Sequence, residues 1–284
     1  MVKSARTGNA GLNQLRQQQQ AAERRRRVMI AGSAVIAILV VVGALIVTSV
    51  LAPKQGAVAA GPLDPGVASA LGNVPASAFD TVAVGVGATN PPTAITAPAL
   101  TADGKPRVLY VGAEYCPFCA GERWPVVVAL SRFGQFSNLK AAMSAPAPET
   151  NPNTPTVSFH GSSYTSHYLS FTGVETQTNT HEELEALSPE DQSLFDTYNP
   201  GGSIPWITFG GQLVQSGASV DPGIFAGKSQ DEIAKAVADP ATEISKAVLG
   251  SANVLTARLC QLTQDQPEAV CSTSGVAAAA ATLP

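Results

Sequence analysis

Short alternating stretches of hydrophobic and polar residues, broken by stretches with helical spacing, occupy this chain from about residue 105 onward. The run from Arg107 to Val111 is continuous and apolar at its centre, which predicts a short buried strand. The segment from Glu122 to Phe133 follows it and repeats apolar residues at helical spacing. Together they predict a strand that leads directly into a helix.

Two more short strands are expected where apolar residues alternate with polar ones, around Val157–Phe159 and Leu169–Phe171. Capping-box patterns at Thr180/Glu183 and at Ser188/Asp191 then predict two short helices, near 181–187 and 189–197.

A hairpin comes next, because the Gly210-Gly211 turn separates Trp206–Phe209 from Gln212–Gln215. Ser229 with Glu232 caps a helix that runs to about residue 238, and Asp239-Pro240 begins another with one apolar face. The expected order is therefore strand, helix, strand, helical insert, hairpin and helix, followed by an extra C-terminal helix. This order predicts an α/β fold.

The N-terminal part has a different pattern. No charged residue occurs from 28 to 53, and a block of arginines at 24–27 precedes this stretch. About 20 apolar helical residues span a bilayer, and basic residues mark the cytoplasmic side. A transmembrane helix at 28–52 is therefore expected, with 1–27 as a basic cytoplasmic tail. A cleaved signal peptide ending near Ala57-Val58-Ala59 is the alternative.

These patterns give the expected domain organisation. Residues 53–104 are rich in Ala, Gly and Pro and are expected to form a linker and an N-terminal arm, with a helix start at Asp64-Pro65. Val67, Leu71, Phe79 and Val82 of this arm are expected to pack on the folded domain at 105–272. The Ala-rich end, 273–284, is expected to be a disordered tail.

Charge narrows the range of partners. Of the 17 Lys and Arg and the 21 Asp and Glu in the 284 residues, the stretch after the basic tail holds 10 and 20. An acidic surface disfavours binding of that part to nucleic acid or to anionic lipid.

The candidate chemistry lies at Cys116-Pro117-Phe118-Cys119, where the first strand is expected to meet the first helix. A thiol in the first turn of a helix is close to free backbone N–H groups and to the positive end of the helix dipole, which favours the reactive thiolate. A second thiol three residues on can close on the first and release a bound partner. A purely structural bridge and half of a zinc site are the alternatives, although four zinc ligands are not apparent.

All four cysteines follow the apolar segment, and an even number in an oxidising compartment suggests two bridges. Three pairings are possible. The natural one joins Cys116 to Cys119 and Cys260 to Cys271, with the second bridge structural.

The run from Ala113 to Cys119 resembles the thioredoxin active site, and its Cys-Pro-aromatic-Cys form is closer to glutaredoxins and DsbA-type oxidoreductases. The longer run from Gly112 to Gly134 resembles a bacterial and archaeal membrane-anchored family of unknown function that is grouped with thioredoxin-like proteins. The resemblance extends over roughly 65–272, and it implies a thioredoxin-like domain with a helical insert.

The resemblance also implies roles for individual residues. Cys116 would be the attacking thiol and Cys119 the resolving one. Pro205 would follow a cis peptide bond that turns the Ile204 backbone toward Cys116, where it contacts substrate together with Pro117 and Phe118. Thioredoxins carry a buried acid six residues before the first cysteine.

Here that position is Tyr110, and Glu114 is expected to be a solvated surface acid. His160 and His167 are alternative residues that could move the proton of the resolving thiol.

The function expected from these features is thiol–disulfide exchange by a single-pass membrane protein whose C-terminal domain lies outside the cytoplasm. No metal or organic cofactor is expected. The expected partners are exported proteins that contain cysteine, or a redox partner in the membrane. A non-enzymatic thioredoxin-like scaffold is the first alternative, and a metal-handling thiol protein is the second.

Overall fold

A mixed α/β fold is seen in the computed structural model of this protein, which describes residues 60–85 and 90–283. The strands of the main sheet run in the order β2, β11, β10, β4 and β9, with β3 beside the start of β4. Their bounds are Thr93–Ala94, Leu213–Ser216, Trp206–Phe209, Lys105–Gly112, Ser170–Glu175 and Thr101–Ala102. Among the described strands only β4 and β9 pair in parallel, and the connection between them contains α4 (Pro117–Ser131).

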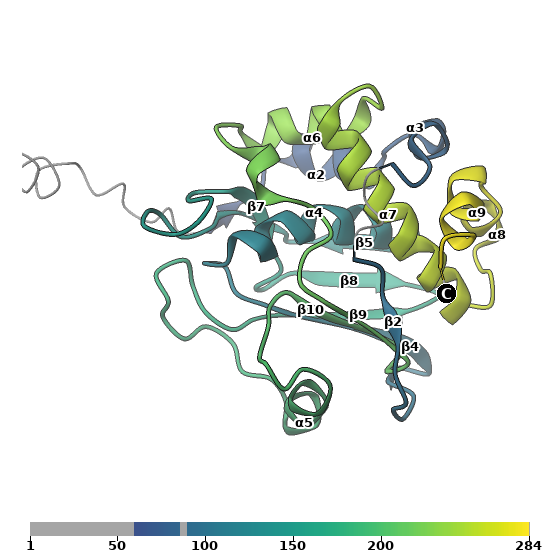
Figure 1. The fold of residues 1–284 in the computed structure, drawn as a ribbon, viewed down its shortest axis with the longest axis horizontal. Coiled ribbons are helices and arrows are strands. Elements are labelled where there is room, and N and C mark those ends of the chain that lie inside the picture. The colour runs from purple at the N-terminus through teal and green to yellow at the C-terminus, as the bar shows by residue number, and fades with distance from the viewer. Residues whose placement is uncertain (1–59, 86–89, 284) are drawn as a thin grey trace, which may run out of the picture. The chain divides into compact units, whose positions relative to one another are not determined.

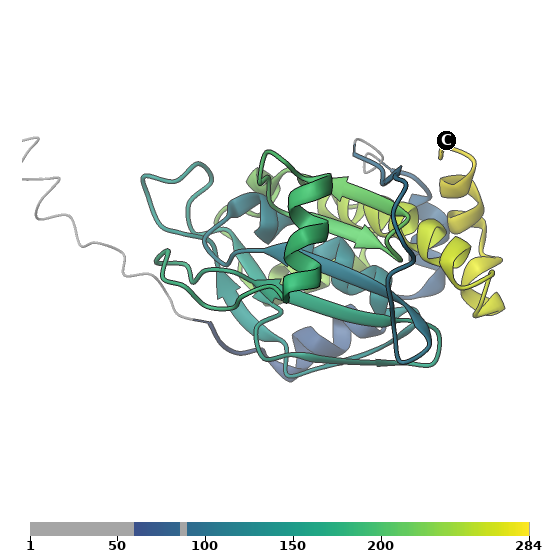
Figure 2. The same ribbon diagram turned by 90° about the horizontal axis from the view of Figure 1, so that it is seen from below.

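Residues on β4 alternate between two buried layers. Val108 and Tyr110 join a cluster with α4 and α7 (Glu243–Leu262), whereas Leu109 and Val111 join one with α5 (Pro189–Tyr198). This period of two is what a strand with two covered faces requires. Figure 1 shows α4 and α7 on one side of the sheet and α5 on the other, and Figure 2 shows α5 crossing the strands.

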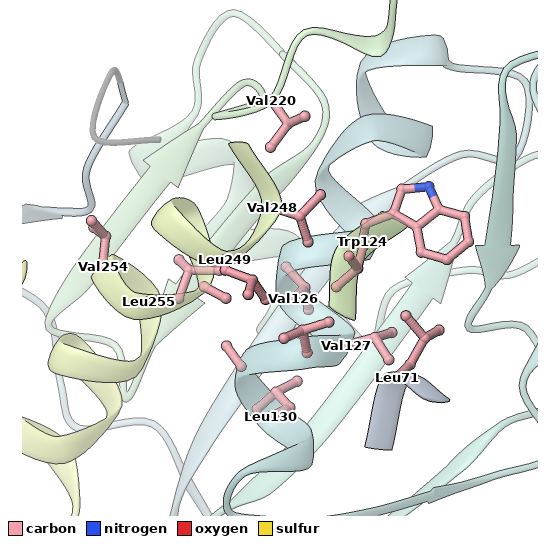
Figure 3. Packing of buried hydrophobic residues seen from close by; sticks show 14 of the residues in the cluster. Leu71, Trp124, Val126, Val127, Leu130, Val220, Val248, Leu249, Val254 and Leu255 are labelled. Carbon is pink, nitrogen blue, oxygen red and sulfur yellow. The ribbon is translucent and has the colours of Figure 1, made fainter. Parts of the chain in front are cut away.

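Helix α4 is buried around its whole circumference, including every residue from Cys119 to Leu130. A helix that is buried on all sides belongs in the middle of a core, and α4 lies between the sheet and the outer helices. Figure 3 shows Val126, Val127 and Leu130 of α4 beside Val248 and Leu255 of α7.

Smaller elements surround this core. Two further sheets are antiparallel: β1–β6–β7 (Gly61–Pro62, Lys140–Met143, Pro155–Ser158) and β5–β8 (Gly134–Ser137, Ser163–Ser166). The remaining helices are α2 (Pro65–Gly72), α3 (Ala76–Val82), the 3-10 helix η1 (Pro222–Phe225), α6 (Gln230–Ala238), α8 (Glu268–Cys271) and α9 (Ser274–Ala280).

Several expected elements are present. Asp64 caps α2, the Ser229/Glu232 capping box begins α6, and Ser188 caps α5. The hairpin is confirmed, with β10 at the expected residues and β11 one residue later than expected. Val67, Leu71, Phe79 and Val82 of the N-terminal arm are buried in the core, as expected.

The prediction of a helix at 181–187 is wrong. Thr178 and Glu182 are joined by a backbone hydrogen bond of 2.8 Å, and the Thr178 hydroxyl accepts from the Glu182 N–H. His181 has a φ of 65°, in the left-handed region. The backbone groups of this turn make bonds that a helix does not have, and the left-handed φ of His181 is incompatible with a right-handed helix.

The C-terminal segment also differs from the expectation. Residues expected in a disordered tail form α9, in which Val276 and Ala279 are buried against α3 and α7. The Gly275 N–H donates to Asp80 at 2.8 Å. Apolar alanines therefore serve as packing residues here.

The expected fold class needs a correction at its N-terminal end. In the stretches 60–85 and 90–283, no helix is both long enough and apolar enough to cross a membrane. The finding does not support the expected single-pass transmembrane helix. The segment 28–52, to which that helix was assigned, and the basic tail 1–27 lie outside the described residues.

Candidate functional site

Cys116 occupies the N-cap position of α4, directly before Pro117. Its Sγ accepts the Cys119 backbone N–H at 3.2 Å. Proline at the first helical position has no N–H to satisfy, and the next free N–H groups point toward the cap residue. The sequence Cys-Pro-Phe-Cys thus builds a helix start in which sulfur takes the place of the usual capping oxygen.

The two thiols of this motif have opposite electrostatic environments. A hydrogen bond from the Cys119 side chain, helped by backbone N–H groups and by Arg123, lowers the pKa of Cys116 to about 7, although burial opposes this. Burial raises the pKa of Cys119 well above that of an ordinary thiol. Both thiols are free in this structure. One thiol is therefore ready to ionise at neutral pH and the other is held protonated.

The Ile204-Pro205 segment lies next to the first thiol. The peptide bond between these residues is cis, as expected, and the Ile204 carbonyl oxygen is 3.9 Å from the Cys116 Sγ. Pro205 is buried just before β10, which pairs with β4. The sheet therefore brings together a motif and a loop that are 88 positions apart.

The residues between and beside the thiols differ in exposure. Phe118 is 47% exposed, and it is the large hydrophobic side chain that stands out at the surface of the described residues. Pro117, which precedes it, is buried. On the other side of Cys116, the Tyr115 ring stacks on His181 with 4.1 Å between centroids. An apolar and aromatic surface therefore borders the thiol.

A buried ion pair lies behind the motif. Arg123, one turn after Cys119 on α4, donates to both carboxylate oxygens of Glu175 at 2.8 and 2.6 Å, and to the Ala113 carbonyl oxygen at 2.7 Å. Both side chains of the pair are completely buried. Neither residue was singled out from the sequence. The spacing of Arg123 from Cys119 was a usable signal, whereas Glu175 becomes a neighbour only through the pairing of β9 with β4.

The acids considered from the sequence need revision. Glu114 was expected at the surface, but it is 4% exposed and accepts a 2.6 Å hydrogen bond from the Ser158 hydroxyl. Tyr110 is fully buried, and burial raises its pKa well above the usual value. Two buried acids therefore lie near the thiols: Glu114, from the loop before the motif, and Glu175, from β9, far beyond the motif in sequence.

A further buried acid, Glu122, lies on α4 itself. It accepts hydrogen bonds from Gln215 and from the Ser219 backbone and hydroxyl, at 2.6 to 2.7 Å. Burial raises its pKa to about 7, although these hydrogen bonds oppose the rise. Glu122 thus joins α4 to the loop after β11 by hydrogen bonds.

The histidines do not gather at the thiols. His160 is 2.9 Å from a carboxylate oxygen of Glu185, and His181 stacks on Tyr115. Within the described residues, no group of three or more His, Cys, Asp or Glu side chains could hold a metal ion.

The other two cysteines form a disulfide between the end of α7 and α8. Cys260 and Cys271 are 11 positions apart, and the chain-entropy model assigns roughly 3 kcal/mol to a loop of about this length. Because Cys260 belongs to the core of α7, this bridge is a structural element outside the thiol site.

One cavity lies outside the thiol site. It has a volume of about 830 Å³ and lies between the N-terminal arm and the end of α4, with Leu63, Val127, Phe136 and Lys140 in its lining. Neither Cys116 nor Cys119 lines it.

Comparison with known proteins adds one relationship. The family model described as a domain of unknown function (DUF929) matches residues 92–200. This match includes β4, the cysteine motif, α4, β9 and α5, and it stops before Ile204-Pro205. No curated protein and no solved structure matches the chain.

The comparisons therefore do not support the expected thioredoxin-like and oxidoreductase relationship. They support a domain of unknown function in an α/β fold, and they show no thioredoxin-like or oxidoreductase relative.

Proposed function

We propose that this protein is a thiol–disulfide oxidoreductase that works through Cys116 and Cys119. The observation that carries the proposal is the asymmetry of the pair. Cys116 caps a helix and has a pKa of about 7, whereas Cys119 is fully buried with a raised pKa. A thiol that ionises near ambient pH is the effective attacker in disulfide exchange.

The exchange has two steps. The Cys116 thiolate attacks one sulfur of a partner disulfide, so that a mixed disulfide forms and the partner's other sulfur leaves. Cys119 then attacks the Cys116 sulfur and loses its proton, the Cys116–Cys119 bond forms, and the partner's second sulfur leaves and takes up a proton. The partner is reduced and the motif is oxidised; the reverse sequence oxidises a partner dithiol.

The surroundings of the pair support a thioredoxin-like arrangement as part of this proposal. The motif lies between a central strand and its helix, a parallel strand follows, and a hairpin begins directly after Pro205. The exposed Phe118 side chain two residues after Cys116 and the Ile204 carbonyl 3.9 Å from its sulfur are groups to which a partner chain containing cysteine would dock.

The proposed partners are exported proteins with cysteines, in a compartment outside the cytoplasm. The Cys260–Cys271 disulfide supports this location, because such bridges persist in oxidising compartments. The exchange itself needs no metal or organic cofactor, because the electrons move between sulfur atoms.

Capture of partners tests the proposal. In the Cys119→Ser variant the mixed disulfide on Cys116 has no resolving thiol, so covalent adducts should accumulate in the native host and disappear on reduction. The Cys116→Ser/Cys119→Ser variant is the matched control and should form none. An absence of adducts, together with a wild-type pair that does not exchange with glutathione, would refute the oxidoreductase.

A second candidate, a non-enzymatic binding module, is favoured by one observation: Cys116 is only 5% exposed. If the exchange experiments fail, the exposed Phe118 side chain and its aromatic neighbours would be the docking surface of such a module. The capture result therefore separates the two functions.

A further inference from the structure

A buried positive charge lies one helical turn behind the resolving thiol. Cys119 and Arg123 are four residues apart on α4, and side chains at this spacing lie on the same face of a helix, with about 5–6 Å between their Cβ atoms. Both residues are completely buried. A cation kept out of water at this position requires compensation from its neighbours.

Most of the donors of Arg123 are used. Its Nε and Nη2 bind Glu175, and Nη2 also binds the Ala113 carbonyl. Its Nη1 is buried and has no hydrogen-bond partner in the part of the chain that the structure describes. Unsatisfied buried donors are rare, and each one in a native structure requires an explanation. Nη1 is therefore the Arg123 donor that is left for a further anion.

The other groups around Cys119 narrow the choice of that anion. Charge interactions reach it from Arg123, from Glu175 on β9 and from Cys116. Tyr110 on β4 also faces the pair, with its ring 6.0 Å from the Arg123 guanidinium, but burial keeps the phenol neutral. Glu114 interacts with Glu175 and is bound by Ser158.

Charge balance then limits the site to one anion at a time. A buried charge without a partner is far more costly than a buried pair. Arg123 supplies one positive charge, and both Glu175 and Cys119 can supply a negative one. When Cys119 is a thiol, Glu175 completes the pair. When Cys119 becomes a thiolate, net charge is conserved if Glu175 takes up the proton.

We propose that Arg123 is a shared counter-ion that pairs with the Glu175 carboxylate while Cys119 is protonated and with the Cys119 thiolate during resolution. This proposal rests on the proposed function and deepens it. The Cys119 proton passes to Glu175 as the thiolate attacks Cys116. Glu175 later releases that proton toward the departing partner sulfur, so that the site returns to its starting charge.

The test measures the pKa of Cys119 in the Cys116→Ser background, by thiolate absorbance against the Cys116→Ser/Cys119→Ser protein. Arg123→Met should raise the pKa of Cys119, because the counter-ion is lost. Glu175→Gln should lower it, because the competing anion is lost while the side-chain shape is kept. Loss of mere structural support would not move the pKa in opposite directions.

Two further variants sharpen the comparison. Arg123→Lys keeps the charge and should return the pKa of Cys119 part of the way to its original value. Glu122→Gln removes a buried acid of the same helix whose hydrogen-bond partners are Gln215 and Ser219, and it should leave the pKa of Cys119 unchanged. In protein with both cysteines, resolution of a mixed disulfide near neutral pH should slow about threefold for each unit by which the pKa of Cys119 rises, because the tenfold loss of thiolate is partly offset by its higher nucleophilicity.

The proposal is overturned if both folded variants leave the pKa of Cys119 unchanged or shift it in the same direction. Should Arg123→Met fail to fold, Glu175→Gln decides alone: a lower pKa supports the counter-ion and any other result rejects it. The measurement needs no partner protein. Opposite pKa shifts without captured adducts would therefore reject only the oxidoreductase, and adducts without those shifts would reject only the counter-ion.

Discussion

Two cysteines only three positions apart receive different chemistry because one caps a helix and the other lies inside it. The Cys116 Sγ accepts the Cys119 N–H, whereas Cys119 is fully buried beside Arg123 and Glu175. Backbone N–H groups favour the thiolate and burial favours the thiol. At the scale of the residue, position along one helical turn gives the two thiols opposite pKa shifts.

The alkylation rate of Cys116 should depend on pH with a midpoint near 7. The thiolate forms as pH rises through the pKa, so the rate should increase with pH and level off above it. The measurement is modification of the reduced protein by iodoacetamide at a series of pH values, followed by peptide mapping. In Cys119→Ala the side-chain hydrogen bond to Cys116 is lost, and the midpoint should move to higher pH. A wild-type midpoint near 8.5, the value of an ordinary thiol, would contradict the prediction.

At the scale of the element, α4 and α9 show that the burial of a helix depends on the neighbouring elements that pack on it. Helix α4 carries Glu122 and Arg123 in its buried middle, and both are accommodated by partners from strands and loops. Helix α9 is a short alanine-rich segment with few large side chains, yet Val276 and Ala279 complete the packing of α3 and α7. Composition alone would place the charged residues of α4 at the surface, and it would leave the alanine-rich α9 unpacked.

Substitution on α9 tests this packing. Val276→Asp should destabilise the protein by roughly 3 kcal/mol or more, because it removes buried apolar surface and places a charge in the core. Ala277→Asp, on the exposed face of the same helix, should change stability by only about 0.5 kcal/mol. Urea unfolding followed by circular dichroism compares the two. Equal and small effects would mean that α9 is not part of the cooperative fold.

At the scale of the whole molecule, the core extends beyond the expected domain at 105–272. Leu71 of α2 and Phe79 of α3 join the cluster built by α4 and α7, and α9 joins it from the other end of the chain. These segments cover helices that would otherwise expose apolar surface. The hydrophobic cluster that contains α4 and α7 is thus completed by residues from both ends of the described chain.

A fragment of residues 105–272 should therefore be much less stable than one of residues 60–284. It lacks α2, α3 and α9 and leaves their contact surfaces on α4 and α7 in water. Comparing the urea midpoints and m-values of the two fragments measures the contribution, and the shorter fragment should show a lower midpoint and a less cooperative transition. Equal urea midpoints would mean that residues 105–272 form the stable domain without the flanking helices.

The sequence alone determined the features that depend on neighbours along the chain. The strand at β4, the capping of α2, α5 and α6 and the turn of the β10–β11 hairpin all follow from local periodicity, capping side chains and glycine. The cysteine motif at a helix start belongs to the same class, because the N–H groups that stabilise Cys116 come from the next few residues.

Only the tertiary structure decided which distant residues meet. Glu175 reaches Arg123 because β9 pairs in parallel with β4, Ile204 reaches Cys116 because β10 pairs with β4 on its other side, and Glu114 is buried because Ser158 covers it. Strand pairing and burial are not encoded in local spacing, since they depend on how the complete core closes. The charge environment of Cys119 arises at this level, where residues far apart in sequence share one dry site.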